Sequence, residues 1–228
     1  MGFTLRGHTT GCVTVNTPST VATLPVTTVA GDCIVVCFAI AGADVGGISV
    51  SGGGATWLGP LQNAAFSMAF IGYNCVGGST SITIGASQGS GDIGQASIGI
   101  FSGVLASSNP VRSSLNTGTA TSGSVSYVVG DLLIGNGGGF GTTSSSPNPS
   151  WSNGATDNLI DRWTAAGSER WNWTSYCVPS SGSSTTYTSG DTVLNNTTVV
   201  VLEPVQPPVP PRFNVGVYLQ AVQRASVR

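Results

Sequence analysis

Ionisable side chains are scarce in this chain, and lysine is missing altogether. Only 7% of the 228 residues are charged, against about 25% in an average soluble domain, and all seven basic residues are arginines. Phosphate binding needs a basic stripe, and the net charge here is −2, so we exclude nucleic acid as a partner. Gly, Ser and Thr supply most of the polar groups, which predicts a surface wetted by hydroxyls and backbone.

The residues needed for catalysis are also few. An enzyme must bring together a nucleophile, a base and a group that stabilises charge. This chain has one histidine, His8, no lysine, and nine carboxylates spread along its length. We therefore predict a non-enzymatic protein with no catalytic residue, no cofactor and no metal ion.

Long apolar runs are absent. The longest, "CIVVCFAIAGA", covers eleven residues, whereas a membrane span needs about 20. The first residues, "MGFTLRGHTTG", contain no apolar core of a signal peptide. We expect no membrane span, no signal peptide, and synthesis in the cytoplasm.

The five cysteines form no CxxC motif. Cys33 and Cys37 are expected on one face of a strand with Val35 between them, two pleats apart and too far to bridge without distortion. A metal site would need partners, and His8 is the single histidine. Buried, reduced cysteines are the favoured interpretation.

An internal repeat organises what is present. The first half reads "AGDCIVVCFAIAG", then a Trp at 57, then "AAFSMAFIGYNCVGGSTSITI" and "ASIGIFSGV". The second half reads "VGDLLIGNGGGFG", then a Trp at 151, then "GSERWNWTSYCVPSSGSSTTY" and "NTTVVVLEPV". The Gly-Asp pair and the cysteine are 44 residues apart in the first half and 47 in the second. The order and spacing predict two equivalent halves.

Each half is interpreted as four β-strands, because Val, Ile, Thr and aromatic residues alternate between clusters of Gly, Ser, Asn and Pro. The predicted fold is all-β, a jelly-roll-like two-sheet sandwich of eight strands over residues 1–203, with "FTLRGHTTGCVTV" as an added N-terminal strand. Asp32 and Asp131 follow glycine at the start of a strand, where each carboxylate is expected to cap the free N–H groups of the turn.

The segments "GDCIVVCFAIAG…TW…AFIGYNCVGGSTSITI…IGIFSGV" and the second "GDLLIGNGGG" resemble the β-sandwich minor tail proteins of phages that infect Actinobacteria. The resemblance covers about residues 1–203 by pattern rather than by long identities. It implies a structural component of a virion and brings no catalytic residues. Related sandwiches in such phages also serve as head-decoration proteins, so a capsid decoration protein is the alternative.

Residues 157–173 hold the densest group of aromatic and charged side chains. Tryptophan faces stack on sugar rings and carboxylates bind sugar hydroxyls, so a glycan or partner surface is one interpretation, with contacts at Asp161, Arg162, Trp163, Glu169 and Arg170. The other interpretation is core packing. An alignment on Cys75 and Cys177 sets Trp171 and Trp173 against Ala69 and Ile71, which would turn both tryptophans inward and Arg170 and Asn172 outward.

The chain ends in a proline-rich segment and an apolar tail. Five prolines fall between residues 204 and 211, which favours a polyproline II spacer over 204–212. An assembly arm over 213–228 follows, with apolar residues at Phe213, Val215, Val217, Leu219 and Val222. We expect this arm to add to the sheet edge or groove of a neighbouring subunit.

These expectations combine in one hypothesis. The protein would be a virion component, most simply a minor tail or tail-tip protein. It would form a homo-oligomer and bind other tail or capsid subunits. The sandwich would face the host surface, and a glycan-binding module is the second alternative.

Overall fold

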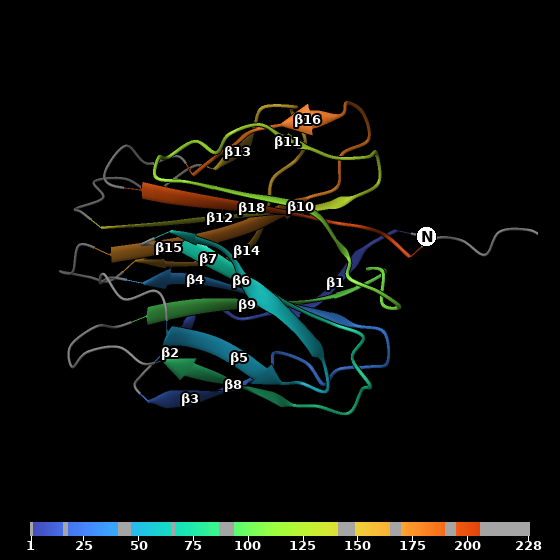
Figure 1. Cartoon of the computed structure of the whole chain (residues 1–228), viewed down its shortest axis with the longest axis vertical. Coiled ribbons are helices and arrows are strands. Elements are labelled where there is room, and N and C mark those ends of the chain that lie inside the picture. The colour runs from blue at the N-terminus through green and yellow to red at the C-terminus, as the bar shows by residue number, and fades with distance from the viewer. Residues whose placement is uncertain are drawn as a thin grey trace, which may run out of the picture.

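β-Strands account for the regular structure of the chain. The computed structural model describes residues 2–15, 18–40, 47–64, 67–86, 94–140, 149–164, 170–189 and 195–205, and these ranges contain eighteen strands and no α-helix (Figure 1). The all-β fold class is therefore confirmed.

The first half forms one large and one small antiparallel sheet. The large sheet has the strand order β1-β9-β4-β7-β6, with β2 also paired to β9, and the small sheet has the order β3-β8-β5. The strands are β1 (Thr4–His8), β2 (Val13–Val15), β3 (Ser19–Thr23), β4 (Cys33–Ile40), β5 (Ile48–Gly52), β6 (Thr56–Ala64), β7 (Ser67–Tyr73), β8 (Ser81–Ala86) and β9 (Gly94–Ser102).

The second half repeats the large sheet strand for strand, in the order β10-β18-β12-β15-β14, and its outer layer consists of the short pairs β11-β16 and β13-β17. Its strands are β10 (Val111–Thr117), β11 (Val125–Ser126), β12 (Leu132–Phe140), β13 (Ser150–Trp151), β14 (Asn158–Thr164), β15 (Arg170–Cys177), β16 (Ser184–Thr185), β17 (Tyr187–Thr188) and β18 (Asn195–Leu202). The predicted internal repeat is thus a repeat of topology, and it includes the N-terminal strand β1, whose counterpart is β10.

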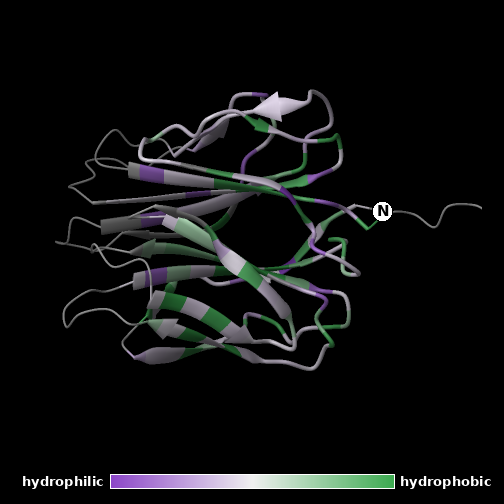
Figure 2. Cartoon of the chain, in the orientation of Figure 1, coloured by the Kyte–Doolittle hydropathy of each residue, from purple (hydrophilic) through white to green (hydrophobic). Residues whose placement is uncertain are grey.

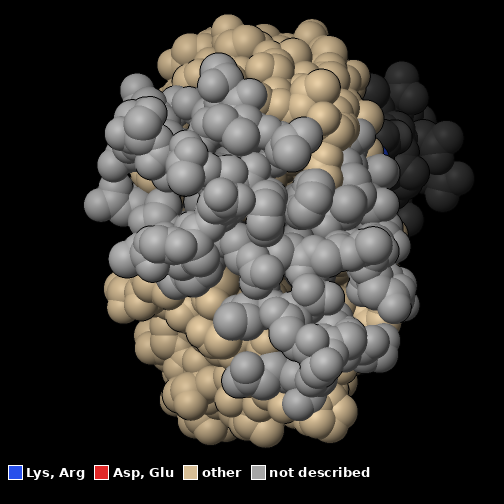
Figure 3. Space-filling model, turned by 90° about the vertical axis from the view of Figure 1, so that its left-hand side faces the viewer, with Lys and Arg blue, Asp and Glu red and all other residues tan. Residues whose placement is uncertain are grey.

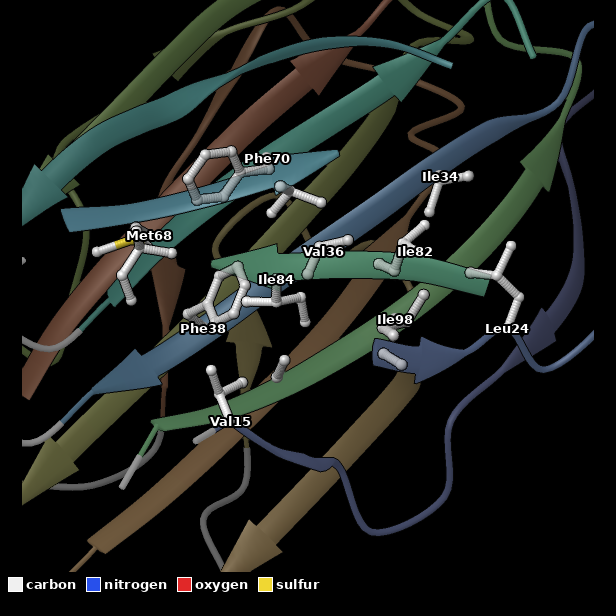
Figure 4. Close-up of a cluster of buried hydrophobic side chains, with 14 of the residues drawn as sticks. Val15, Leu24, Ile34, Val36, Phe38, Met68, Phe70, Ile82, Ile84 and Ile98 are labelled. Carbon is white, nitrogen blue, oxygen red and sulfur yellow. The ribbon is translucent and has the colours of Figure 1, made fainter. Parts of the chain in front are cut away.

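The two large sheets pack face to face, and each outer sheet covers the opposite face of its own large sheet, so the molecule has four layers (Figure 1). Strand β4 shows the consequence. Ile34, Val36 and Phe38 point into the core of the first half, where they meet Ile82 and Ile84 of β8 (Figure 4). The alternate residues of β4 point the other way, into the central core between the large sheets.

Burial on both faces explains why residues 33–39 read "CIVVCFA" without a polar alternation. Cys33, Val35 and Cys37 share the central core and both cysteines are free thiols, as predicted. The second half has its own core of the same kind, in which Leu133, Val199 and Val201 pack against the outer pairs.

This arrangement differs from the single eight-stranded sandwich that we predicted over residues 1–203. In the first half the predicted strand regions contribute β4, β6, β7 and β9 to the large sheet. In the second half the predicted Trp strand is β13, which belongs to the outer layer, so Trp57 and Trp151 are not the equivalent pair that we predicted. The outer strands that complete each half are short or polar on one face. In β16 and β17 only two residues each are in strand conformation, which is too little for a sequence pattern to reveal. Each half therefore closes its own sandwich.

The last described residues still belong to the folded body, although the spacer was predicted to begin at residue 204. Pro204 forms a bridge with Val104, and the N–H of Val205 donates to the carbonyl of Gly103 at 2.8 Å. The first and last described residues lie at the same end of the molecule, since Gly2 also adjoins Gly103. Residues 206–228, with the predicted arm, lie outside the described residues.

Aromatic side chains occupy the space beside two glycines of the large sheets. A Cβ placed on Gly135 of β12 would lie 2.6 Å from the ring of Tyr187, which is fully buried. In the first half, the ring of Trp57 lies in the same way over Gly72 of β7, at 2.9 Å from such a Cβ. The glycine-rich sequence of β12 is thus required in part by the packing of Tyr187.

We predict that Gly135→Ala lowers the free energy of unfolding by about 1–3 kcal/mol, because the added methyl group overpacks against Tyr187. Urea denaturation would measure the loss. The same substitution in a Tyr187→Val background should cost much less, since the ring is gone. An equal cost in both backgrounds would contradict the packing explanation.

Candidate functional site

Both halves place equivalent connections at one end of the molecule, which we call the loop end. Strands β4, β6 and β8 finish there, and so do their counterparts β12, β14 and β17 (left in Figure 1). The connections themselves, 41–46, 65–66, 87–93, 141–148, 165–169 and 190–194, lie outside the described residues. Figure 3 faces this end, where the described surface shows almost no charge.

The predicted contact residues belong to the hairpin of β14 and β15, which reaches the loop end. Arg162 pairs with Trp173, and Trp163 pairs with Asn172, in the register of the two strands. Asp161 is also on β14 and Arg170 begins β15. The backbone thus gathers Asp161, Arg162, Trp163 and Arg170, while their side chains, and Glu169 entirely, lie outside what the structure describes.

Two tryptophans of this region are core residues. Trp173 and Trp151 are buried at 7% and 4% exposure, and Trp151 packs against Tyr187 with ring centroids 4.7 Å apart. The inward orientation predicted for Trp173 is confirmed. The outward orientation predicted for Asn172 is wrong: its side chain is 1% exposed, because the other face of β15 is covered by the first half.

The alignment on the two cysteines is also wrong by several residues. Trp173 pairs with Gly137, six residues after Asp131, and Met68 pairs with Phe38, six residues after Asp32. The counterpart of Trp173 is therefore Met68, not Ile71. Cysteine identity misled the alignment because the two thiols occupy different positions relative to the strands beside them.

The shared face of the two large sheets changes from apolar to polar toward the loop end. On β12 the residues that face the first half run Leu132, Ile134, Asn136, and on β15 they run Tyr176, Thr174, Asn172. Figure 2 shows hydrophilic segments at the loop ends of several strands. The same change occurs on β7, β9 and β18, whose buried polar residues include Ser67, Ser97 and Thr198.

These polar residues form one hydrogen-bonded chain across the halves, which we call the polar seam (Ser67, Ser97, Asn136, Asn172, Thr174 and Thr198). Asn136 donates to the carbonyl of Phe38 at 3.0 Å and to Ser67 Oγ at 2.9 Å. Thr174 donates to Asn136 Oδ1 at 2.8 Å. A buried donor is satisfied only when the halves are in this register, so the polar seam fixes how the two halves pack.

Each half carries one buried Asp that caps the turn before its central strand, as predicted for Asp32 and Asp131. Asp131 accepts from the N–H of Val128 at 2.8 Å and from Arg112 Nε at 2.7 Å. Asp32 repeats the arrangement, with the N–H of Val29 at 2.8 Å and an ion pair to Arg6. The arginine partners were not predicted; the signal was present in "LRG" and "VRS", which stand in equivalent first strands.

Asp157 has the most perturbed carboxylate environment among the described residues. It accepts from Trp151 Nε1 at 2.8 Å and from Ser175 Oγ at 2.6 Å. Burial raises the pKa of Asp157 above its ordinary value, although the two hydrogen bonds oppose the shift. The hydroxyl oxygens of Ser175 and Tyr187 lie 3.2 Å apart, and burial raises the pKa of Tyr187. The cluster holds no cationic group, and it connects core residues rather than opening a reaction site.

The cysteines give no reactive thiol in the cores. Cys33, Cys37, Cys75 and Cys177 are buried and free, and Cys12 is half-buried. Burial raises the pKa of Cys37 to about 12 and of Cys177 to about 12, with negative Asp157 adding to the latter. A thiol with so high a pKa is a poor nucleophile at neutral pH.

His8 is exposed, and its Nδ1 lies 2.7 Å from the carbonyl of Thr9. Within the described ranges, no group of three or more His, Cys, Asp or Glu residues could hold a metal ion. No helix that is long and apolar enough to cross a membrane occurs in the same ranges. The predicted arm residues Phe213, Val215, Val217, Leu219 and Val222 lie outside the described part of the chain.

Comparison with protein-family models, with curated proteins and with solved structures found no match to this chain.

We predict that Arg112→Met lowers the free energy of unfolding by about 2 kcal/mol, because it leaves the buried carboxylate of Asp131 without its cation. Thermal or urea unfolding would measure the loss, and Arg6→Met should behave alike in the first half. The double variant Arg112→Met, Asp131→Asn should recover part of the stability, since no unpaired charge remains. A further loss in the double variant would contradict this explanation.

The raised pKa of Asp157 predicts a pH dependence of stability. A group whose pKa is higher in the folded than in the unfolded state stabilises the fold below the unfolded value, 3.8, and loses this contribution as the pH rises through the folded value. The stability of the wild type relative to Asp157→Asn should therefore fall as the pH rises above 3.8. Urea titrations of both proteins at a series of pH values would measure it. A difference that is constant or grows with pH would refute the prediction.

Proposed function

We propose that this protein is a structural component of a bacteriophage virion, most simply a minor tail or tail-tip protein of a phage that infects Actinobacteria. The residues that resemble such proteins lie in the repeated strands β4, β7, β9 and β12. The proposal assigns the protein no enzymatic activity, and places other tail or capsid subunits among its partners.

The order of strands in each half supports the proposal. Along the chain, β1 and β2 belong to the large sheet, β3 to the small, β4 to the large, β5 to the small, β6 and β7 to the large, β8 to the small and β9 to the large. We infer that each half is a jelly roll of eight strands, with β1 and β2 counted as one in the first half and β16 and β17 as one in the second. Jelly rolls are common in viral capsid proteins and in lectins, although a fold alone assigns no function.

The opposition of the two ends is the single observation that carries the proposal. The last described residue, Val205, adjoins Gly103 at one end of the molecule, and the strands that precede the undescribed connections of both halves finish at the loop end. A protein with this plan attaches through one end and presents the other. We propose that residues 206–228 attach it to the virion and that the loop end faces the host surface.

The glycan-binding alternative rests on the β14–β15 hairpin at the loop end. With Trp151 and Trp173 in the core, Trp163 and Trp171 are the tryptophans of this region left as candidates for a sugar surface. Loss of glycan-array binding in Trp163→Ala, with unchanged binding in Trp57→Phe, would favour this alternative. Release of sugar from any glycan would overturn the proposal of a non-enzyme.

We predict that a chain ending at Val205 folds but does not enter virus particles. The cut should follow Val205, because Pro204 and Val205 still pair with the first half. Quantitative mass spectrometry of purified particles would measure incorporation, with circular dichroism as the check of folding. Incorporation at the wild-type level would contradict the attachment role.

The copy number of the full chain separates the two placements on the virion. A few copies per particle would agree with the tail tip, and hundreds would agree with the alternative, a capsid decoration protein. Absence of the protein from particles of the phage that encodes it would refute both.

A further inference from the structure

Strands β1, β6, β10 and β14, at the edges of the two large sheets, are interrupted by bulges, whereas the three-residue strand β2, which continues the β1 edge along β9, keeps a regular register. An exposed edge strand invites another strand to pair with it, and a bulge hinders this by twisting the edge away. Charged side chains usually share this task, but this chain has few. The register shifts lie at Leu5/Gly7 of β1, Val111/Ser113 of β10, Leu159/Asp161 of β14, and Leu58/Leu61 and Leu61/Ala64 of β6.

Strand β3, at the edge of the small sheet, has no such protection. It pairs with β8 in an uninterrupted register from Ser19↔Gly85 to Thr23↔Ser81. Its sequence, STVAT, contains neither charge nor proline. Within the described ranges, β8 is its only hydrogen-bonded neighbour strand.

The open side of β3 presents backbone groups in a regular row. The N–H of Leu24 donates to the carbonyl of Thr80 at 2.8 Å, and the N–H of Ala86 donates to that of Pro18 at 2.9 Å. In an antiparallel pair, alternate residues of a strand form hydrogen bonds with the neighbouring strand. These two flanking bonds show that the even-numbered residues of β3 are the ones bonded to β8. The N–H and C=O groups of Ser19, Val21 and Thr23 therefore point away from the sheet, and Val21 is 70% exposed.

The comparable edges of the outer layers are partly occupied or short. On β5, the carbonyl of Gly52 accepts from Trp57 Nε1 at 2.9 Å, and the chain turns directly into β6. On β11, the counterpart of β3, only two residues are in strand conformation, and the carbonyl of Ser126 accepts from Ser113 Oγ at 3.1 Å. The second half thus lacks the edge that the first half offers.

Apolar surface beside β3 would be covered by an added strand. Val13 of β2 and Val26, which follows β3, pack against the core of the first half but are only partly buried. Both lie on the side of the sandwich where β2 and β3 form its border. Side chains of a new strand that point inward would extend the row of Ala22 and meet this surface.

We propose that β3 accepts an extended strand from a second copy of this chain, and that the strand is segment 213–219. This rests on the proposed function, since it names the acceptor for the attachment arm. The segment, FNVGVYL, is uncharged and alternates apolar residues with Asn214, Gly216 and Tyr218. Pairing of backbones supplies affinity and the alternate side chains supply register.

The length and stiffness of the connecting chain favour a second copy over the same molecule. Four of the seven residues from 206 to 212 are proline, and a proline-rich spacer of this length holds its ends about 22 Å apart as a semi-rigid rod. Val205, from which the spacer continues, adjoins Gly103 at the end of β9. To reach β3 of its own chain, a rod of this length would have to turn back around the layers of the first half, so we expect the arm to meet β3 of another copy.

A contact between an arm and a different surface on the next copy is heterologous. Repeated, it generates a closed ring if the rotation closes and a filament if it does not. Native mass spectrometry of the full chain should therefore show a ring of defined copy number or an open series, rather than a dimer alone.

The test uses the full chain and two substitutions. Val21→Pro removes an N–H that points outward, so the edge should tolerate it while the ring blocks an added strand. Val21→Thr, the matched control, keeps the N–H and a β-branched side chain. Sedimentation velocity should show self-association of the wild type, weakened at least tenfold by Val21→Pro and by Val215→Asp with Val217→Asp, and changed by less than threefold in the control. The combined edge and arm variant should be no weaker than either alone.

Hydrogen exchange of the wild type provides a second measurement should Val21→Pro fail to fold. The amides of Ser19, Val21 and Thr23 should exchange more slowly at high protein concentration, and this slowing should vanish in the arm variant. A wild type that is monomeric at all concentrations, or a folded Val21→Pro that associates normally, would overturn the proposal. The proposal would also be overturned if these amides exchanged slowly in the monomer and lost this slow exchange in the arm variant. That result would show that the arm pairs within its own chain.

The outcome is separable from that of the proposed function. A protein that associates through β3 but is absent from virus particles would leave this inference standing and remove the function. If the wild type is found in particles and its Val21→Pro variant associates and assembles normally, the proposed function stands and this inference is refuted.

Discussion

Burial of both large sheets on both faces is the constraint on which the rest of this structure depends. Each of these sheets must present one apolar face to its outer layer and another to the second half. Polar residues are therefore admitted only where a partner is fixed, as for Asn136 in the polar seam. Charged residues in the body of the fold stand at the turns, where Asp32 and Asp131 each cap backbone N–H groups and meet an arginine.

The same constraint determines which surfaces can bind a partner. Both faces of each large sheet are buried by packing, so the exposed surfaces are the two ends of the molecule and the outer layers. The first and last described residues lie at one end, and the strands that precede the undescribed connections of both halves finish at the other. Duplication gives the loop end two equivalent sets of connections, which differ in sequence. A surface built in this way can diverge without disturbing the cores, because the cores need only the strands.

The sequence predicted the strand content and the repeat because both depend on local pattern. Strands such as β4 have apolar residues on both faces, and the Gly-Asp turns mark where they begin. The number of layers was missed because the outer strands are short, and because polar residues such as Asn172 on β15 suggested a solvent-facing side. Burial of those residues comes from hydrogen bonds made across the halves, between strands about 75 residues apart in sequence. For the contact residues at 161–170, the sequence identified a dense group of aromatic and charged residues but left open whether the tryptophans pack in the core.

With so few charged residues, this chain must limit the pairing of its exposed edge strands by backbone geometry, such as bulges. Each large-sheet edge carries a bulge, and one carbonyl at the edge of β5 and one at the edge of β11 accept from Trp57 and Ser113. The edge at β3 combines an uninterrupted register of five residues with an absence of charge. The second half has the same plan, but its counterpart strand β11 is only two residues long. Selection against non-specific pairing acts on every exposed edge, so an edge left open in one half alone is best explained by a strand that pairs there.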